Sequence, residues 1–142
     1  MNTDKENKEL LLSSLFEGDS DNGHLNRVSE IIIGCAFRVG NTLGCGFLEK
    51  VYENALALEL KKAGLDVVQQ QKIQVLYDDA VVGDYEADLV VNDQIIVELK
   101  AVRDLNPVHR AQCFNYLRAT RLKLCLLINF GNPRVEIKRI II

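Results

Sequence analysis

The sequence predicts an α/β (α+β) domain in which helices flank a mixed β-sheet. Apolar residues recur at spacings of three and four in two stretches between residues 25 and 64, which is typical of helices. Short runs rich in Val, Ile and Leu follow, and these runs are typical of strands. A further helix and two more strands complete the order, and this alternation favours a layered sandwich.

The size and composition indicate one globular domain. The chain has 142 residues, of which 48% are hydrophobic and 26% are charged, so it can bury a sizeable core. We expect residues 1–24, a short apolar patch between polar flanks, to be a mobile tail. Residues 25–142 would then form the single domain.

Several features lead us to expect a cytoplasmic protein. No apolar run is long enough to span a membrane, and the polar, charged N-terminus does not look like a signal peptide. The cysteines lack the spacing of a zinc site. Each has apolar neighbours, so we interpret them as reduced core residues: Cys35, Cys45, Cys113 and Cys125.

Two helices are predicted before the strands. The first begins near Leu25 and ends at a glycine-rich loop, residues 40–46. Its expected buried face is Val28, Ile31, Ile32, Cys35 and Val39. The second covers residues 47–64, and Gly64 is a suitable stop. Its expected buried face is Leu48, Val51, Ala55 and Leu58, with Leu60 as an additional candidate.

The remaining elements follow from apolar runs and turn residues. Residues 67–77 can form one long strand, and residues 81–85 lead into a hairpin. After the hairpin, Pro107 starts a helix that ends near Thr120. Two strands end the chain: residues 122–130, apolar enough to be fully buried, and residues 134–142, expected near a sheet edge.

Three charged residues, Asp88, Glu98 and Lys100, lie within the two apolar strands of the hairpin, residues 87–91 and 95–100. Glu98 and Lys100 share a face because side chains alternate along a strand. A two-residue loop would turn Asp88 away from Glu98, whereas a three-residue loop would set the two opposite each other. We expect the three-residue loop, or a bulge with the same effect.

Two opposed carboxylates require a positive partner. They repel by about 4 kcal/mol at ~4 Å and an effective dielectric constant of ~20. A divalent cation would hold them, and oxygen ligands favour Mg²⁺ or Mn²⁺. Glu49, in the first turn of the second helix, is a candidate third acid aimed at Asp88. Simpler alternatives are an ion pair of Lys100 within the sheet and a solvated Glu49.

The charges are distributed unevenly along the chain. Residues 1–99 contain 8 Lys or Arg and 18 Asp or Glu, whereas residues 100–142 contain 9 and 2. This permits a phosphate-facing basic surface beside an acidic site. A solvated basic face is an equal alternative. The basic residues are Lys100, Arg103, Arg110, Arg118, Arg121, Lys123, Arg134, Lys138 and Arg139.

The order of these motifs resembles the PD-(D/E)XK nuclease superfamily, through Asp88 and Glu98-Leu99-Lys100, with Ala87 in place of the motif's Pro. Gly46-x-x-Glu49-x-x-Tyr52 is similar to the signature of the GxxExxY protein family. Gln112-x-x-x-Tyr116 looks like the QxxxY motif of RecB-like nucleases. The resemblance covers nearly everything after residue 25 and implies a restriction-endonuclease-like core.

This resemblance implies Mg²⁺- or Mn²⁺-dependent hydrolysis of phosphodiester bonds, with DNA as the expected substrate. Asp88, Glu98 and Glu49 would hold the metal, and Lys100 would orient the attacking water. Gln112 and Tyr116 would position the lysine, the water or the nucleic-acid backbone. Phosphate contacts are expected from Arg103, His109, Arg110 and Arg118.

Two alternatives to a nuclease stay open. One is a catalytically silent module with the same fold that binds nucleic acid or protein. The other is a metal-dependent enzyme acting on another phosphate ester, such as a nucleotide. A homodimer through the last strand is a further expectation by analogy, and a dimer would suit duplex substrates.

Overall fold

The computed structural model describes residues 20–142 and contains three helices and five strands in this range. The elements are α2 (Ser20–Leu43), α3 (Glu49–Lys62), β1 (Val67–Tyr77), β2 (Ala80–Val91), β3 (Ile95–Lys100), α4 (Pro107–Thr120), β4 (Leu124–Asn129) and β5 (Glu136–Ile141). Their order is the predicted one. Residues 1–19 of the expected mobile tail lie outside the described part of the chain. No helix in the described range could cross a membrane.

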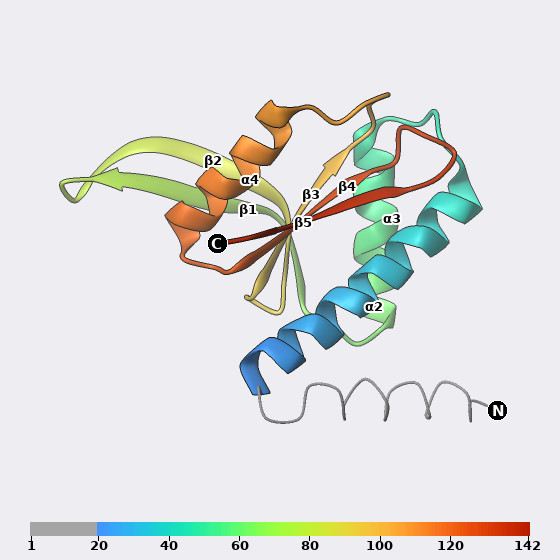
Figure 1. Ribbon diagram of the computed structural model, residues 1–142, viewed down its shortest axis with the longest axis horizontal. Helices are drawn as coiled ribbons and strands as arrows, with labels where there is room; N and C mark the ends of the chain where they lie inside the picture. The colour runs from blue at the N-terminus through green and yellow to red at the C-terminus, as the bar shows by residue number, and fades with distance from the viewer. Residues whose placement is uncertain (1–19) are drawn as a thin grey trace.

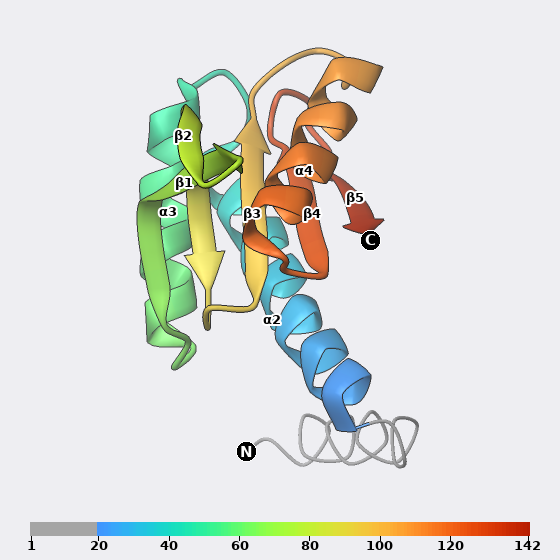
Figure 2. The same cartoon turned by 90° about the vertical axis from the view of Figure 1, so that its left-hand side faces the viewer.

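The five strands form one mixed sheet in the order β1-β2-β3-β4-β5. Only β3 and β4 are parallel; the other neighbours are antiparallel. A parallel pair requires a crossover, and α4 supplies it. Helices α2 and α3 cover one face of the sheet and α4 covers the other, which gives three layers (Figure 1, Figure 2). The predicted α+β sandwich is confirmed.

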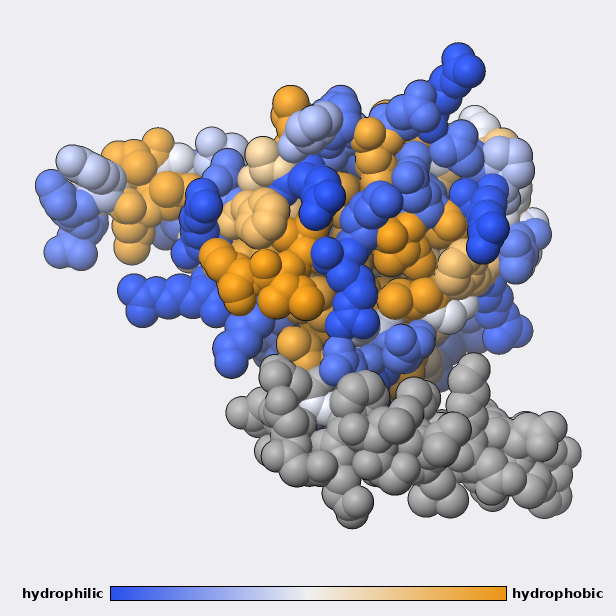
Figure 3. Space-filling view, in the orientation of Figure 1, coloured by the Kyte–Doolittle hydropathy of each residue, from blue (hydrophilic) through white to orange (hydrophobic). Residues whose placement is uncertain are grey.

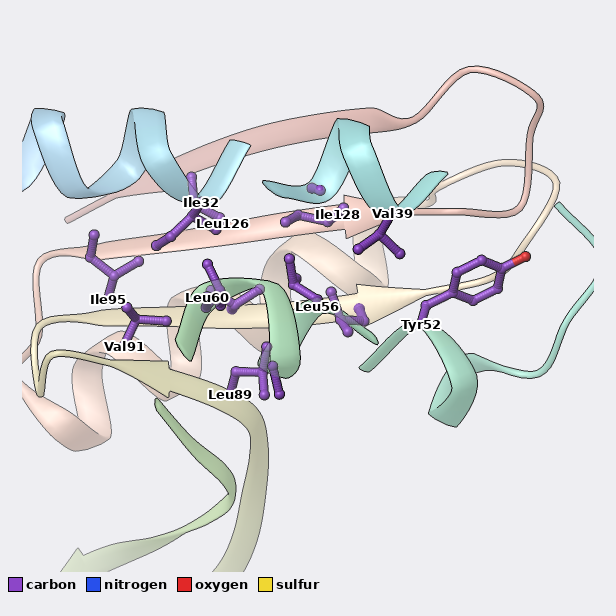
Figure 4. Packing of buried hydrophobic residues seen from close by; sticks show 14 of the residues in the cluster. Ile32, Val39, Tyr52, Leu56, Leu60, Leu89, Val91, Ile95, Leu126 and Ile128 are labelled. Atoms are coloured by element: carbon purple, nitrogen blue, oxygen red, sulfur yellow. The ribbon is translucent and has the colours of Figure 1, made fainter. Parts of the chain in front are cut away.

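The core has one cluster on each face of the sheet. On the face covered by α2 and α3, the helix residues Ile32, Leu56 and Leu60 pack against the strands (Figure 4). The other cluster lies under α4 and includes Leu117 and Leu127. Strand β4 is buried at every position, as its apolar sequence predicts.

Helix α2 is longer than predicted at both ends. It begins at Ser20 instead of Leu25 and continues through Gly40 to Leu43. Gly40 is buried, and a Cβ there would collide with Val135, so this glycine serves close packing rather than a loop. Ile31, expected in the core, is 40% exposed.

The predicted buried face of α3 is wrong at Leu48, Val51 and Leu58, whereas Ala55 packs against the core and Leu60 is buried as expected. Leu48 is 81% exposed and Leu58 is 60% exposed, whereas Tyr52, Leu56 and Leu60 are fully buried. Both sets have helical spacing, so periodicity alone cannot choose between them. The choice follows from Tyr52, whose ring stacks on Phe130 with centroids 4.7 Å apart.

One cysteine also differs from expectation. Cys45 is exposed in the loop between α2 and α3, while Cys113 and Cys125 are buried and Cys35 is half-buried. The glycines on both sides of Cys45 have positive φ, and this turn leaves its side chain outside the core.

The outer parts of β1 and β2 project from the sheet as an arm, residues 71–87 (Figure 1, Figure 2). Strand β2 pairs with β1 over its whole length but with β3 only from Leu89 to Val91. The point where β2 leaves β3, at Asp88 and Glu98, is called the fork below. Several apolar side chains of the arm are exposed (Figure 3): Leu76, Tyr77, Val81, Val82 and Tyr85.

Candidate active site

The hairpin between β2 and β3 has the three-residue loop that was expected. Val91 pairs with Ile95, and Asn92 and Asp93 in the turn have φ of 52° and 53°. The amide of Gln94 donates to the carbonyl of Val91 at 3.0 Å, which closes the turn. This register brings the carboxylates of β2 and β3 to one side of the sheet at the fork.

Asp88 and Glu98 bridge the strands in both directions. The backbone N–H of Asp88 donates to Oε1 of Glu98 at 3.0 Å. The N–H of Leu99 donates to Oδ2 of Asp88 at 2.8 Å. These bonds take the place of the strand ladder where β2 and β3 separate. They fix both carboxylates at the fork.

The electrostatics of the fork disfavour ionised carboxylates. Burial, followed by the charge of Asp88, raises the pKa of Glu98 to about 8. Burial also raises the pKa of Asp88, although the Leu99 amide opposes this. Burial and then the charge of Asp88 raise the pKa of Glu49. Lys100 lowers all three pKa values but does not outweigh burial.

The donor set fits a hard divalent cation. A cation would favour the ionised form of each carboxylate and reverse the rise in pKa. Among residues 20–142 no cluster of three or more His, Cys, Asp or Glu side chains is arranged to hold a metal ion. Mg²⁺, however, usually takes one or two carboxylates and completes its shell with water and substrate phosphates. The pair at the fork meets that requirement.

Tyr52 shapes the loop that leads into α3. Its hydroxyl donates to the carbonyl of Gly44 at 2.6 Å and accepts from the amide of Phe47 at 3.2 Å. Gly46 has φ +114°, which favours glycine. Gly46 and Tyr52 therefore set the start of the helix, and Glu49 occupies its first turn.

Two residues near the fork were not identified from the sequence. Glu53 is 4% exposed, and its Oε1 accepts from Nε2 of Gln70 at 2.7 Å. The same Nε2 lies 3.4 Å from Oδ1 of Asp88. Gln70 has φ 53° and interrupts the β1–β2 ladder opposite Asp88. The helical spacing of Glu49 and Glu53 was the only signal in the sequence.

The spacing of Gln112 and Tyr116 predicts that their side chains meet, and they do. Nε2 of Gln112 donates to the Tyr116 hydroxyl at 2.9 Å. Burial, followed by the charge of Glu98, raises the pKa of Tyr116 to about 12. The ring lies beside that of Tyr85, with centroids 5.9 Å apart. This part of α4 therefore faces the fork.

The four expected phosphate contacts are not in one place. His109 and Arg118 line a groove of about 860 Å³ that also contains Lys100. Arg110 lines a different hollow, and Arg103 is exposed and lines neither of the two.

His109 also has a structural role at the start of α4. Its Nδ1 accepts from the Asn106 amide at 3.3 Å, while the Asn106 side chain accepts from Val108. These bonds form a capping box at the helix N-terminus. Burial, followed by the charge of Lys100, lowers the pKa of His109.

The segment after Lys100 is held by a buried amide. Asn129, which pairs with Lys100 across the β3–β4 ladder, accepts from the Val102 amide and donates to its carbonyl at 3.0 and 2.8 Å. Gly131 lies so close to Val102 that a Cβ would strike its backbone. The direction of the chain beyond the site is thereby fixed.

Comparison with known proteins identifies the protein family to which this chain belongs. A family model described as the PD-(D/E)XK nuclease superfamily matches residues 26–140. The chain belongs to this superfamily, whose nucleases act on nucleic acid and generally use divalent metal ions. A search of curated proteins finds no match.

A solved structure is also similar to this chain. It is the crystal structure of an alkaline exonuclease (LHK-Exo) from Laribacter hongkongensis, with a TM-score of 0.45 and 14% sequence identity. The similarity covers 80% of this chain and 81% of that chain.

Proposed function

We propose that this protein is a nuclease that hydrolyses phosphodiester bonds in DNA with Mg²⁺ or Mn²⁺. The observation that carries the proposal is the fork, where Asp88 and Glu98 are held together by reciprocal hydrogen bonds. A buried Glu98 beside a half-buried Asp88, both with raised pKa values, is an unfavourable place for two negative charges unless a cation binds them.

Asp88 and Glu98 would be the principal metal ligands, with Glu49 as the candidate third, although the three side chains are not arranged as one metal-binding cluster within residues 20–142. The bound ion would polarise the scissile phosphate and stabilise charge on the leaving oxygen. Glu49 is near enough to Asp88 and Lys100 for their charges to affect its pKa, which supports its place in the same site. The GxxExxY assignment rests on this glutamate and on the loop that positions it.

Lys100 would hold the attacking water and offset negative charge in the transition state. It lies two residues after Glu98 on the same strand, so the two side chains share a face. Gln112 and Tyr116 would orient the lysine, the water or the substrate backbone. Their hydrogen bond and the proximity of Tyr116 to Glu98 support this role and the QxxxY assignment.

Cleavage of plasmid and single-stranded DNA with Mg²⁺ or Mn²⁺ tests the proposal. Wild type is compared with Lys100→Ala and with Lys61→Ala, which changes an exposed lysine at the far end of α3. We expect Lys100→Ala to lose at least about 100-fold in rate and Lys61→Ala to match wild type. Equal rates for both variants and wild type would refute the assignment.

A silent binding module is the second candidate function. Both fork carboxylates bond to backbone amides, so they could serve the fold alone. Binding of DNA without cleavage, in wild type and in Lys100→Ala alike, would favour this candidate.

A homodimer is a further part of the proposal. Strand β5 is an edge strand of the sheet, and edge strands can pair with a second copy. Light scattering after size-exclusion chromatography measures the mass directly, and a monomer at micromolar concentration would exclude this pairing.

A further inference from the structure

A groove leads away from the fork between α4 and the arm. Its volume is about 860 Å³, and side chains from both elements line it. Figure 1 shows the arm passing beside α4. Lys100 is at the end nearest the fork, and Arg118 and Arg121 lie towards the C-terminal end of α4.

The charge of this groove suits a polyanion. Its lining includes Lys100, Arg118 and Arg121 but no Asp or Glu. Both arginines are exposed, and neither forms an ion pair with another residue in the range 20–142. Unpaired cations along a concave surface attract phosphates and hold them.

Apolar and aromatic side chains in the lining suit the flat faces of nucleic-acid bases. Val75, Leu76 and Tyr85 come from the arm, and Tyr116 and Ala119 come from α4. In a duplex, base faces are stacked and only base edges are accessible in the grooves. A single strand exposes the faces, which stack on aromatic side chains beside a basic track.

We infer that this groove binds a single strand of nucleic acid and guides it to the fork. The inference rests on the proposed nuclease function and specifies its substrate: an unpaired strand, with bases against Tyr85 and phosphates on Arg118 and Arg121. From His109 to Arg121, α4 extends about 18 Å at 1.5 Å per residue. That length holds about five nucleotides at the ~3.4 Å spacing of stacked bases.

Binding is measured without metal, so that cleavage does not enter the result. Fluorescence anisotropy in EDTA compares a 12-nucleotide DNA strand with the corresponding duplex. The variants are Tyr85→Ala and Arg118→Ala. Their matched controls are Tyr77→Ala, an exposed tyrosine of the same arm outside the groove, and Arg38→Ala, on the opposite face of the sheet.

We expect wild type to bind the single strand more tightly than the duplex. Tyr85→Ala should weaken single-strand binding at least about fivefold, and Tyr85→Phe should restore it because the ring is retained. Arg118→Ala should reduce the salt dependence by about one unit of slope. Each control variant should bind within about twofold of wild type. Tyr85 is 51% exposed, so its replacement leaves the core intact.

The outcomes separate this inference from the proposed function. Single-strand binding unchanged in Tyr85→Ala and Arg118→Ala, or a wild-type preference for duplex, would overturn the groove assignment even if the protein cleaves DNA. Weakened single-strand binding in both variants supports the groove assignment, whether or not the wild type cleaves DNA. Absence of cleavage by the wild type with Mn²⁺ would refute the nuclease function and leave the groove assignment standing.

Discussion

The carboxylate of Glu98 accepts a hydrogen bond from the backbone of Asp88, and that of Asp88 accepts one from Leu99 in return. The two acids therefore hold together the strands that position them. This reciprocity means that a change at either residue acts on local structure and on ion binding, so variants must separate the two effects.

Asp88→Asn should abolish metal binding while the fold survives. The amide oxygen of Asn can still accept from Leu99, but the side chain has lost the charge that attracts a cation. In a thermal-shift assay, Mn²⁺ should raise the Tm of wild type and of Asp84→Asn, an exposed control on the arm, but not that of Asp88→Asn. An Mn²⁺ shift that persists in Asp88→Asn would count against the metal site.

Stability without metal should fall as pH rises from about 4.5 to about 8. In this window folded Glu98, with a pKa of about 8, keeps a proton that the unfolded chain releases at its ordinary pKa of 4.5. Because the folded state binds more protons, the free energy of unfolding decreases with pH. Urea unfolding in EDTA measures the slope.

Glu98→Gln should flatten this pH profile, whereas Glu86→Gln, at an exposed position on the arm, should leave it unchanged. Mn²⁺ binds the ionised carboxylates, so its stabilising effect should grow across the same window. A wild-type profile that rises with pH in EDTA would contradict the assigned direction.

Tyr52→Phe should reduce both the stability of the protein and its rate of DNA cleavage, with the larger effect on cleavage. The variant keeps the ring stacked on Phe130 but loses the hydroxyl that bonds to Gly44 and Phe47. A cost of about 1–2 kcal/mol is expected from these bonds. Because they set the start of α3, we also expect a reduced cleavage rate through misplacement of Glu49. Unchanged cleavage alongside the stability loss would confine Tyr52 to a structural role.

Gln70→Ala should destabilise the protein by about 1–3 kcal/mol, because it leaves buried Glu53 without one of its donors. Gln71→Ala is the matched control, since the only hydrogen bond of that side chain within the described range is to the backbone of Lys72. Chemical denaturation of both variants measures the difference. Equal stabilities would show that the Gln70–Glu53 bond contributes nothing net.

Local chemistry made much of the fold predictable. The helix from Pro107 to Thr120 follows from proline at its start, and its Asn106 cap is local as well. The polar break at residues 92–94 permitted the three-residue loop that was expected, and the structure has this loop, which brings Asp88 and Glu98 together. In each case the deciding contacts are between residues close in the sequence.

The predictions that were wrong concern features that depend on contacts between residues far apart in the sequence. The expected set that includes Leu48 and Leu58 has helical spacing, and so does the buried set Tyr52, Leu56 and Leu60, whose Tyr52 stacks on the distant Phe130. Gln70 reaches Glu53 through an irregular backbone that no strand pattern predicts. The groove depends on how the arm lies against α4, which strand periodicity does not specify.

Among the described strands, β2 pairs beyond the fork with β1 alone, and the turn at Asp78 and Asp79 lies at the tip of this two-stranded arm. Residues added or removed at this turn would lengthen or shorten the arm without shifting Asp88 or Glu98. The distance to which the arm extends towards a substrate can therefore differ among related proteins while the geometry of the reaction centre stays the same.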